Sequence, residues 1–148
     1  MYRLRFLPLL FIAATAASCG TPDVSFDEVA RVTGPSGKVD AVLVETNGGA
    51  TTSFGYNIYV VPNGQRLSKP NAQIAELYGA VRNENAYGVN LRWEGADSVA
   101  VEYLKAEKAE VLTESVEVAG ERVRIILRPN VADPSAPAGG MLYNLKKN

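Results

Sequence analysis

One loop concentrates the side chains that could bind a ligand. Between Thr46 and Gly55 the chain reads TNGGATTSFG, which is rich in glycine and in hydroxyl side chains. Glycine readily adopts positive φ, and successive N–H groups in such a loop can form an anion-binding concavity to which hydroxyls add donors. The alternative is a wide hairpin loop whose threonines and serine satisfy their own backbone. The candidate binding residues are Gly48, Gly49, Thr51, Thr52, Ser53 and Tyr56.

The sequence has few of the residue types needed for catalysis or metal binding. The chain has no histidine and a single cysteine, so it lacks a Ser-His pair, and no soft metal site is expected. It has no phosphate-binding or dinucleotide-binding glycine motif. We therefore expect no catalytic residue, no metal and no cofactor. Asp23, Asp27 and Glu28 lie close together in sequence and could form a pair for acid-base chemistry, but carboxylates outside a pocket are usually solvated.

Two apolar segments flank the loop and would position it. Val39 to Glu45 and Tyr56 to Val61 are rich in β-branched and aromatic residues and are typical of strands, the first covered on most of both faces. Turn signals stand before and after them, at Gly34 to Gly37 and at Pro62 to Gly64. We expect an antiparallel pair with the loop at one end.

Alternation of apolar and polar residues predicts two further hairpins. In the first, Tyr87 to Glu94 pairs with Ser98 to Tyr103, and Trp93 points into the core. In the second, Val111 to Val118 pairs with Arg122 to Arg128. The three arginines of the last segment form a basic stripe, which is either a solvent-facing strand protected by charge or a surface for an acidic partner or lipid headgroups.

Three segments are less clearly patterned. Val24 to Val32 is mixed and favours an edge strand. Ala72 to Val81 has apolar residues at helical spacing, after Asn71 as a possible cap, and predicts a short helix, with a strand as the alternative. Lys105 to Glu110 is charged and is expected to form one helical turn or a solvated link.

The beginning of the chain has the pattern of a signal peptide. A basic segment, Met1 to Arg5, precedes a charge-free apolar run of 12 residues, Phe6 to Ala17, which is too short to span a bilayer comfortably. Small residues before Cys19 resemble the bacterial lipobox, with Ala16 where leucine is usual, and this implies that Cys19 is lipidated. Cleavage by the ordinary signal peptidase is the alternative. Gly20 lacks the aspartate of an inner-membrane retention signal, so an outer-membrane position facing the periplasm is expected in a two-membraned bacterium.

Two resemblances rest on the central segment. GPSGKVDAVLV resembles one element of TolB-type β-propeller blades, with Ser36 where those repeats usually have aspartate. The longer stretch from Gly34 to Trp93 is similar to small uncharacterised bacterial lipoproteins that carry GGATTSFGY, a strand and then a later strand with tryptophan. The second resemblance implies export and lipid anchoring but no particular activity.

The sequence therefore predicts a mainly β fold, an antiparallel meander or small β-sandwich of about seven strands with at most one short helix. The expected organisation is a lipoprotein signal peptide over 1–18, a lipid-anchored tether over 19–23, a β-rich domain over 24–129 and a Pro/Gly-rich tail over 130–148.

The expected function is that of a bacterial envelope lipoprotein that acts as a non-catalytic binding module. Its partners would be the membrane, through lipidated Cys19, and an envelope protein or a small ligand. The formal net charge of −1 does not support nucleic-acid binding, for which a larger clustered basic face would be expected. The alternatives are a small envelope hydrolase that uses carboxylates or threonine, and an inhibitor or immunity-type protein.

Overall fold

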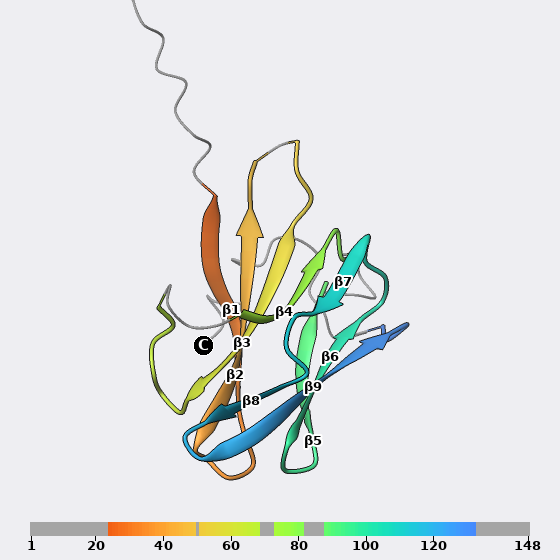
Figure 1. Cartoon of the computed structure of the whole chain (residues 1–148). Helices are drawn as coiled ribbons and strands as arrows, with labels where there is room; N and C mark the ends of the chain where they lie inside the picture. Colours follow the sequence, from red (N-terminus) through yellow and green to blue (C-terminus); the bar gives the residue numbers. More distant parts are fainter. Residues whose placement is uncertain (1–23, 50, 69–72, 82–87, 133–148) are drawn as a thin grey trace, which may run out of the picture.

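The computed structural model of the chain describes residues 24–49, 51–68, 73–81 and 88–132. In these ranges nine strands form two sheets, joined by turns and loops (Figure 1). The mainly β fold predicted from the sequence is confirmed. No helix able to cross a membrane occurs in these ranges. The expected signal peptide and tether, and the tail from residue 133, lie outside the described residues.

Sheet A has five strands in the order β1-β2-β3-β4-β7, and every neighbouring pair is antiparallel. Sheet B has four strands in the order β5-β6-β9-β8, and its central pair, β6 and β9, is parallel. The strands of sheet A are β1 (Ser25–Thr33), β2 (Val39–Asn47), β3 (Gly55–Pro62), β4 (Gln73–Tyr78) and β7 (Lys108–Val111). Those of sheet B are β5 (Asn90–Glu94), β6 (Ser98–Tyr103), β8 (Ser115–Val118) and β9 (Glu121–Pro129).

The sheets pack face to face, and β2 is buried on both of its faces. Every residue from Val39 to Glu45 is buried, as the continuous apolar run predicts. One side of β2 joins the main core between the sheets, to which β1, β3, β4, β5, β6 and β9 contribute. The other side belongs to a second apolar cluster on the outer face of sheet A. That cluster consists of Val42, Val44, Tyr59 and Val61, with Leu67 packed against it.

The three strand pairs predicted as hairpins all occur in the structure. β2 pairs with β3, β5 with β6 and β8 with β9, all antiparallel. The β8–β9 turn uses positive φ at Ala119 and Gly120, which suits the twist of a tight hairpin. Trp93 is confirmed as a core residue, since its ring packs against the main cluster.

The helix predicted over Ala72 to Val81 is wrong, and the strand alternative is correct. Gln73–Tyr78 form β4, which pairs with β3 and β7. A bulge at Ile74 shifts the register, because Gln73 lies opposite Tyr59 while Ala75 lies opposite Ile58. The extra residue allows Ile74 and Leu77 both to enter the main core. In a regular strand two residues three apart would point to opposite faces. The bulge places both on one face, and apolar residues spaced three apart on one face are typical of a helix.

The segment from Lys105 to Val118 also differs from the prediction. Lys108–Val111 form β7 at the edge of sheet A, in place of a helical turn or solvated link. Val111 to Val118 is not one strand, because the chain leaves sheet A after Val111 and enters sheet B at Ser115. Both Leu112 and Thr113 donate their N–H groups to the Ile74 carbonyl, at 2.9 and 3.1 Å. These bonds hold the crossing beside β4.

Candidate functional site

One end of the sandwich gathers the predicted loop, the start of β1 and the end of β4. Ser25 lies opposite Asn47, and Gly55 lies opposite Tyr78. The first residues of β1, the β2–β3 loop and Tyr78 therefore lie at the same end of sheet A, at the top of Figure 1. We call this the loop end.

The β2–β3 loop is held largely by its own hydrogen bonds. The Asn47 side-chain oxygen accepts from the Gly49 N–H at 2.9 Å, and Gly49 has a φ of 101°. The Gly49 carbonyl accepts both the N–H and the hydroxyl of Thr52, each at 3.1 Å. These contacts fit the simpler prediction of a hairpin loop that satisfies its own backbone.

The base of the loop is bound to β4 and to the β6–β7 connection. The Ser53 N–H donates to the Tyr78 hydroxyl at 2.9 Å, and the Ser53 hydroxyl lies 3.3 Å from a Glu107 carboxylate oxygen. Two backbone bonds of 3.0 Å join Gly79 to Phe54 and Glu107 to Tyr78. The loop is therefore a projection on a fixed base. Sequence reasoning missed Tyr78 and Glu107, because the first was assigned to a helix and the second to a solvated run.

The predicted binding residues are only partly brought together. Gly48, Gly49, Thr51, Thr52 and Ser53 lie on the loop, and Thr51 is exposed near its apex. Tyr56 is fully buried in the main core and therefore lies away from the loop surface. The N–H groups of Gly49, Thr52 and Ser53 already have acceptors within the protein. These three donors do not line an open anion-binding concavity.

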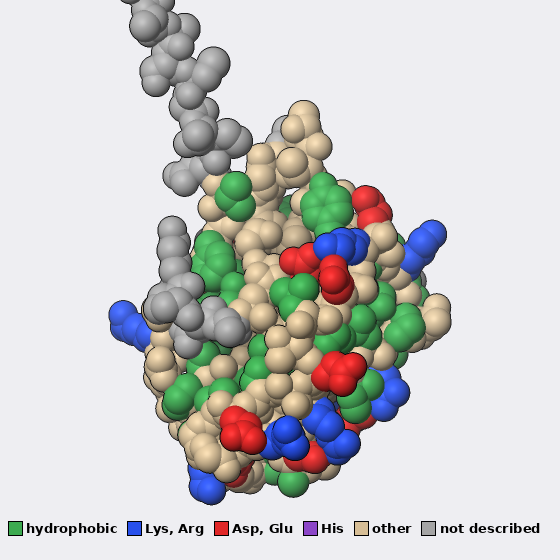
Figure 2. Space-filling model, viewed as in Figure 1, with side chains coloured by type: hydrophobic (Ala, Val, Ile, Leu, Met, Phe, Trp, Pro, Cys, Tyr) green, Lys and Arg blue, Asp and Glu red, His purple; other side chains and the backbone are tan. Residues whose placement is uncertain are grey.

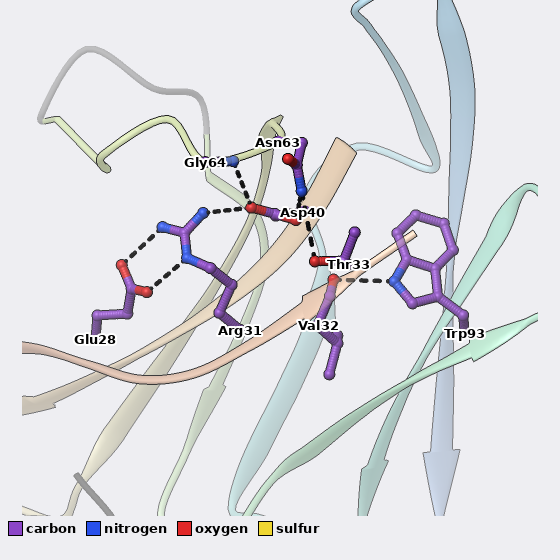
Figure 3. Close-up of polar contacts among 8 residues, drawn as sticks. All are labelled: Glu28, Arg31, Val32, Thr33, Asp40, Asn63, Gly64 and Trp93. Carbon is purple, nitrogen blue, oxygen red and sulfur yellow. Dashed lines mark hydrogen bonds and ion pairs between the residues drawn. The ribbon is translucent and has the colours of Figure 1, made fainter. Parts of the chain in front are cut away.

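A second feature is a buried carboxylate on the outer face of sheet A (Figure 3). The Asp40 side chain is 2% exposed and accepts from Arg31 Nη1 at 2.8 Å. It also accepts from the Asn63 side-chain amide and from the Gly64 N–H, both at 2.9 Å. Asp40 thereby connects β1, β2 and the segment after β3. Arg31 in turn donates to both oxygens of Glu28, at 2.7 and 2.9 Å.

The environment of Asp40 favours its ionised form. Burial by itself would raise the pKa of this carboxyl. Hydrogen bonds from the Gly64 N–H and Arg31 oppose burial, and the side chains of Thr33 and Asn63 add to them. The net result is a pKa below the ordinary aspartate value. Asp40 is therefore a charged structural residue at neutral pH.

Beside this network lies a shallow groove of about 330 Å³ on the outer face of sheet A. Its walls are formed by Phe26 and Glu28 from β1 and by Arg66 and Leu67 from the segment after β3. The Phe26 ring is 49% exposed and makes an edge contact with Tyr59, with centroids 6.3 Å apart. Two of the four wall residues are apolar and two are charged, and both oxygens of the one carboxylate are already bound by Arg31.

The carboxylates considered for acid-base chemistry do not converge on a pocket. Asp27 lies opposite Glu45, which is on the side of β2 that faces the core. Glu28 lies opposite Val44, which is on the outer face. Asp27 and Glu28 therefore point to opposite sides of β1. Asp23 lies outside the described residues. Among the described residues no group of three or more potential metal ligands occurs.

The basic stripe of β9 is largely neutralised by acidic neighbours. Arg124 donates to Asp97 at 2.9 Å, and Arg128 donates to Glu94 at 2.8 Å. Glu94 also binds Arg92 from the same outer face of sheet B. This surface therefore resembles a solvated, charge-protected sheet face more than an open site for an acidic partner.

Comparison of the chain with protein-family models, with curated proteins and with solved structures found no match.

Proposed function

We propose that the protein is a lipid-anchored, non-catalytic binding module of the bacterial cell envelope, with the loop end as its contact surface. The signal-like segment before Cys19 supports the anchor. The observation that carries the choice of surface is the loop itself, an exposed polar projection whose base is fixed to β4 and the β6–β7 connection by Ser53, Tyr78 and Glu107. Loops on rigid scaffolds are common contact sites.

The anchor is tested by Cys19→Ser in the full-length chain. A thioether-linked lipid and an acylated amino terminus hold a protein on a membrane, whereas a serine cannot be modified in this way. We expect wild type in the membrane fraction and labelled by a palmitate analogue, and the variant unlabelled and released from that fraction. An unlabelled wild type would contradict lipidation.

The contact surface is tested by replacing Thr51, Thr52 and Ser53 with alanine. We expect little change in Tm, since these side chains are at the exposed end of the molecule, and loss of the partner captured by the wild-type protein from gently solubilised envelopes. Gln65→Ala, at an exposed position beyond the opposite end of β3, is the control and should keep the partner. Equal capture by both variants would remove the loop from the contact surface.

The groove supports a second binding candidate. Phe26 and Leu67 offer apolar contact, and Arg66 offers an exposed cation, a combination that suits a small amphiphilic anion. The hydrolase alternative has less support, because Asp27 and Glu28 face apart and Glu28 is held by Arg31. An inhibitor or immunity-type protein would use the same exposed loop and differs only in the identity of its partner.

A further inference from the structure

The loop end is also the end of the domain at which the chain leaves the proposed anchor. β1 begins at Ser25, beside Asn47 and the β2–β3 loop. Only Gly20 to Asp23 separate Cys19 from Val24, and a fully extended chain from Cys19 to Val24 spans at most about 18 Å. A lipid on Cys19 therefore keeps the loop end close to the bilayer, whichever way the domain turns.

We infer that the loop end rests on the lipid bilayer, so that the membrane interface is a contact of this surface in addition to any captured partner. This inference depends on the lipidation of Cys19. Besides the tether length, it rests on where exposed apolar side chains lie. Among the described residues the exposed large hydrophobic side chains are Val24 at 55%, Phe26 at 49%, Leu112 at 44% and Tyr78 at 39%.

Three of these four side chains gather at the loop end. Val24 and Phe26 stand at the start of β1, and Tyr78 is the last residue of β4. In Figure 2 hydrophobic side chains flank the projecting loop at the top of the view. A phenylalanine ring adds apolar contact with acyl chains, and tyrosine is suited to the membrane interface because its ring is apolar and its hydroxyl is polar. Leu112 follows β7 and is remote from this end, since Lys108 and not Val111 lies opposite Tyr78.

The opposite end of the domain has a different surface. Lys38 and Ser36 in the β1–β2 turn both contact Glu121, and Arg124 pairs with Asp97 beside the β5–β6 turn. The nine residues of β2 separate the two ends by about 27 Å at the usual rise of a strand. The loop end, which carries most of the exposed large hydrophobic side chains among the described residues, therefore faces the anchor, while the opposite end is directed into the aqueous compartment.

The chemistry of the contact is apolar rather than electrostatic. Glu107 adds a negative charge to the loop end, and Lys108 is engaged by Glu76 and Glu110. Among the described residues at this end, basic side chains are therefore not in excess, and anionic lipids are not specifically attracted. The exposed rings would insert at the headgroup level, with the Thr51 hydroxyl among headgroup oxygens, and this adds a second, weak membrane signal to the acyl chains.

The inference is tested with fluorescent labels on the acylated full-length protein in phosphatidylcholine vesicles. Acylated Cys19 has no free thiol, so a new cysteine is the only site for a thiol-reactive label. We expect a headgroup-linked quencher to reduce emission from Thr51→Cys and to leave Ala96→Cys, in the exposed β5–β6 turn, unchanged. Raised salt should not alter this difference. Equal emission from both labels on vesicle-bound protein would overturn the inference.

A matched pair of surface variants separates membrane contact from anchoring. Phe26→Ser should weaken the quenching at position 51, whereas Leu112→Ser, which removes a similarly exposed apolar side chain away from the loop end, should not. If neither changes the signal, the apolar contact is absent. Quenching at position 51 that is absent in pure phosphatidylcholine vesicles and appears only when other envelope proteins are added would show that lipid does not make the contact, and would overturn the inference. Failure of wild type to float with vesicles would instead reject the proposed anchor.

Discussion

Asp40→Asn is expected to lower the free energy of unfolding by about 3 kcal/mol, within the range for breaking a buried charged pair. The reason is that Asp40 is 2% exposed and binds Arg31, Asn63 and the Gly64 N–H. Asparagine keeps the shape of the side chain but loses the charge and presents N–H donors where these groups need an acceptor. Urea unfolding at neutral pH measures the loss.

The same substitution predicts how stability depends on pH. Folding lowers the pKa of Asp40. The stability that the Asp40 carboxylate contributes is therefore complete above its pKa in the unfolded chain, about 4, and is lost as the pH falls through its pKa in the folded protein. The difference between wild type and Asp40→Asn should therefore shrink in acid. Asp97→Asn is the control, because the Asp97–Arg124 pair is 55% and 60% exposed and should contribute little. A loss no greater than that of the control would show that Asp40 is not a structural carboxylate.

Trp93→Ala is expected to cost about 3 kcal/mol, at the lower end for removing a large aromatic side chain because the ring is only partly buried. The indole N–H donates to the Val32 carbonyl at 3.0 Å. The ring also lies against Gly34, where an added Cβ would be 3.1 Å from its Cζ2 atom. Trp93 thus joins β5 of sheet B to the end of β1 in sheet A.

Two variants separate the contributions of Trp93. Trp93→Phe keeps an aromatic ring but loses the bond to Val32, and should cost about 1 kcal/mol through that hydrogen bond, in addition to lost packing area. Thermal unfolding of both variants shows which of them is more destabilised. If alanine and phenylalanine are equally destabilising, packing of the ring is not the main contribution. If neither destabilises, Trp93 does not join the sheets.

The parts of the fold that sequence predicts are those controlled by local pattern. Apolar content and turn residues gave β2 and β3 their bounds to within a few residues, and the β8–β9 hairpin followed from alternation around Ala119 and Gly120. The failures arise where long-range pairing overrides local spacing. The bulge at Ile74 made β4 resemble a helix, and β7 forms because the edge of β4 accepts a strand of charged residues.

The site was less predictable, because its contacts join distant parts of the chain. Asp40 appeared only as a polar interruption in an apolar strand, since its partners Arg31 and Asn63 belong to other elements. The loop was recognisable from its glycines and hydroxyls. Its support by Tyr78 depends on the register between β3 and β4, which sequence spacing did not reveal, and the burial of Tyr56 depends on which side of β3 faces sheet B.

The two edge strands of sheet A are built in a way that opposes pairing with the sheets of neighbouring molecules. At one edge, β1 carries a bulge at Val29, and the Val32 carbonyl already accepts a hydrogen bond from the Trp93 indole N–H. At the other, β7 is only four residues long and exposes Lys108 and Glu110. A membrane anchor would confine neighbouring copies to two dimensions, where unpaired strands meet often. Interrupted, short and charged edges oppose the joining of one sheet to the next, and so permit crowding on a surface without aggregation.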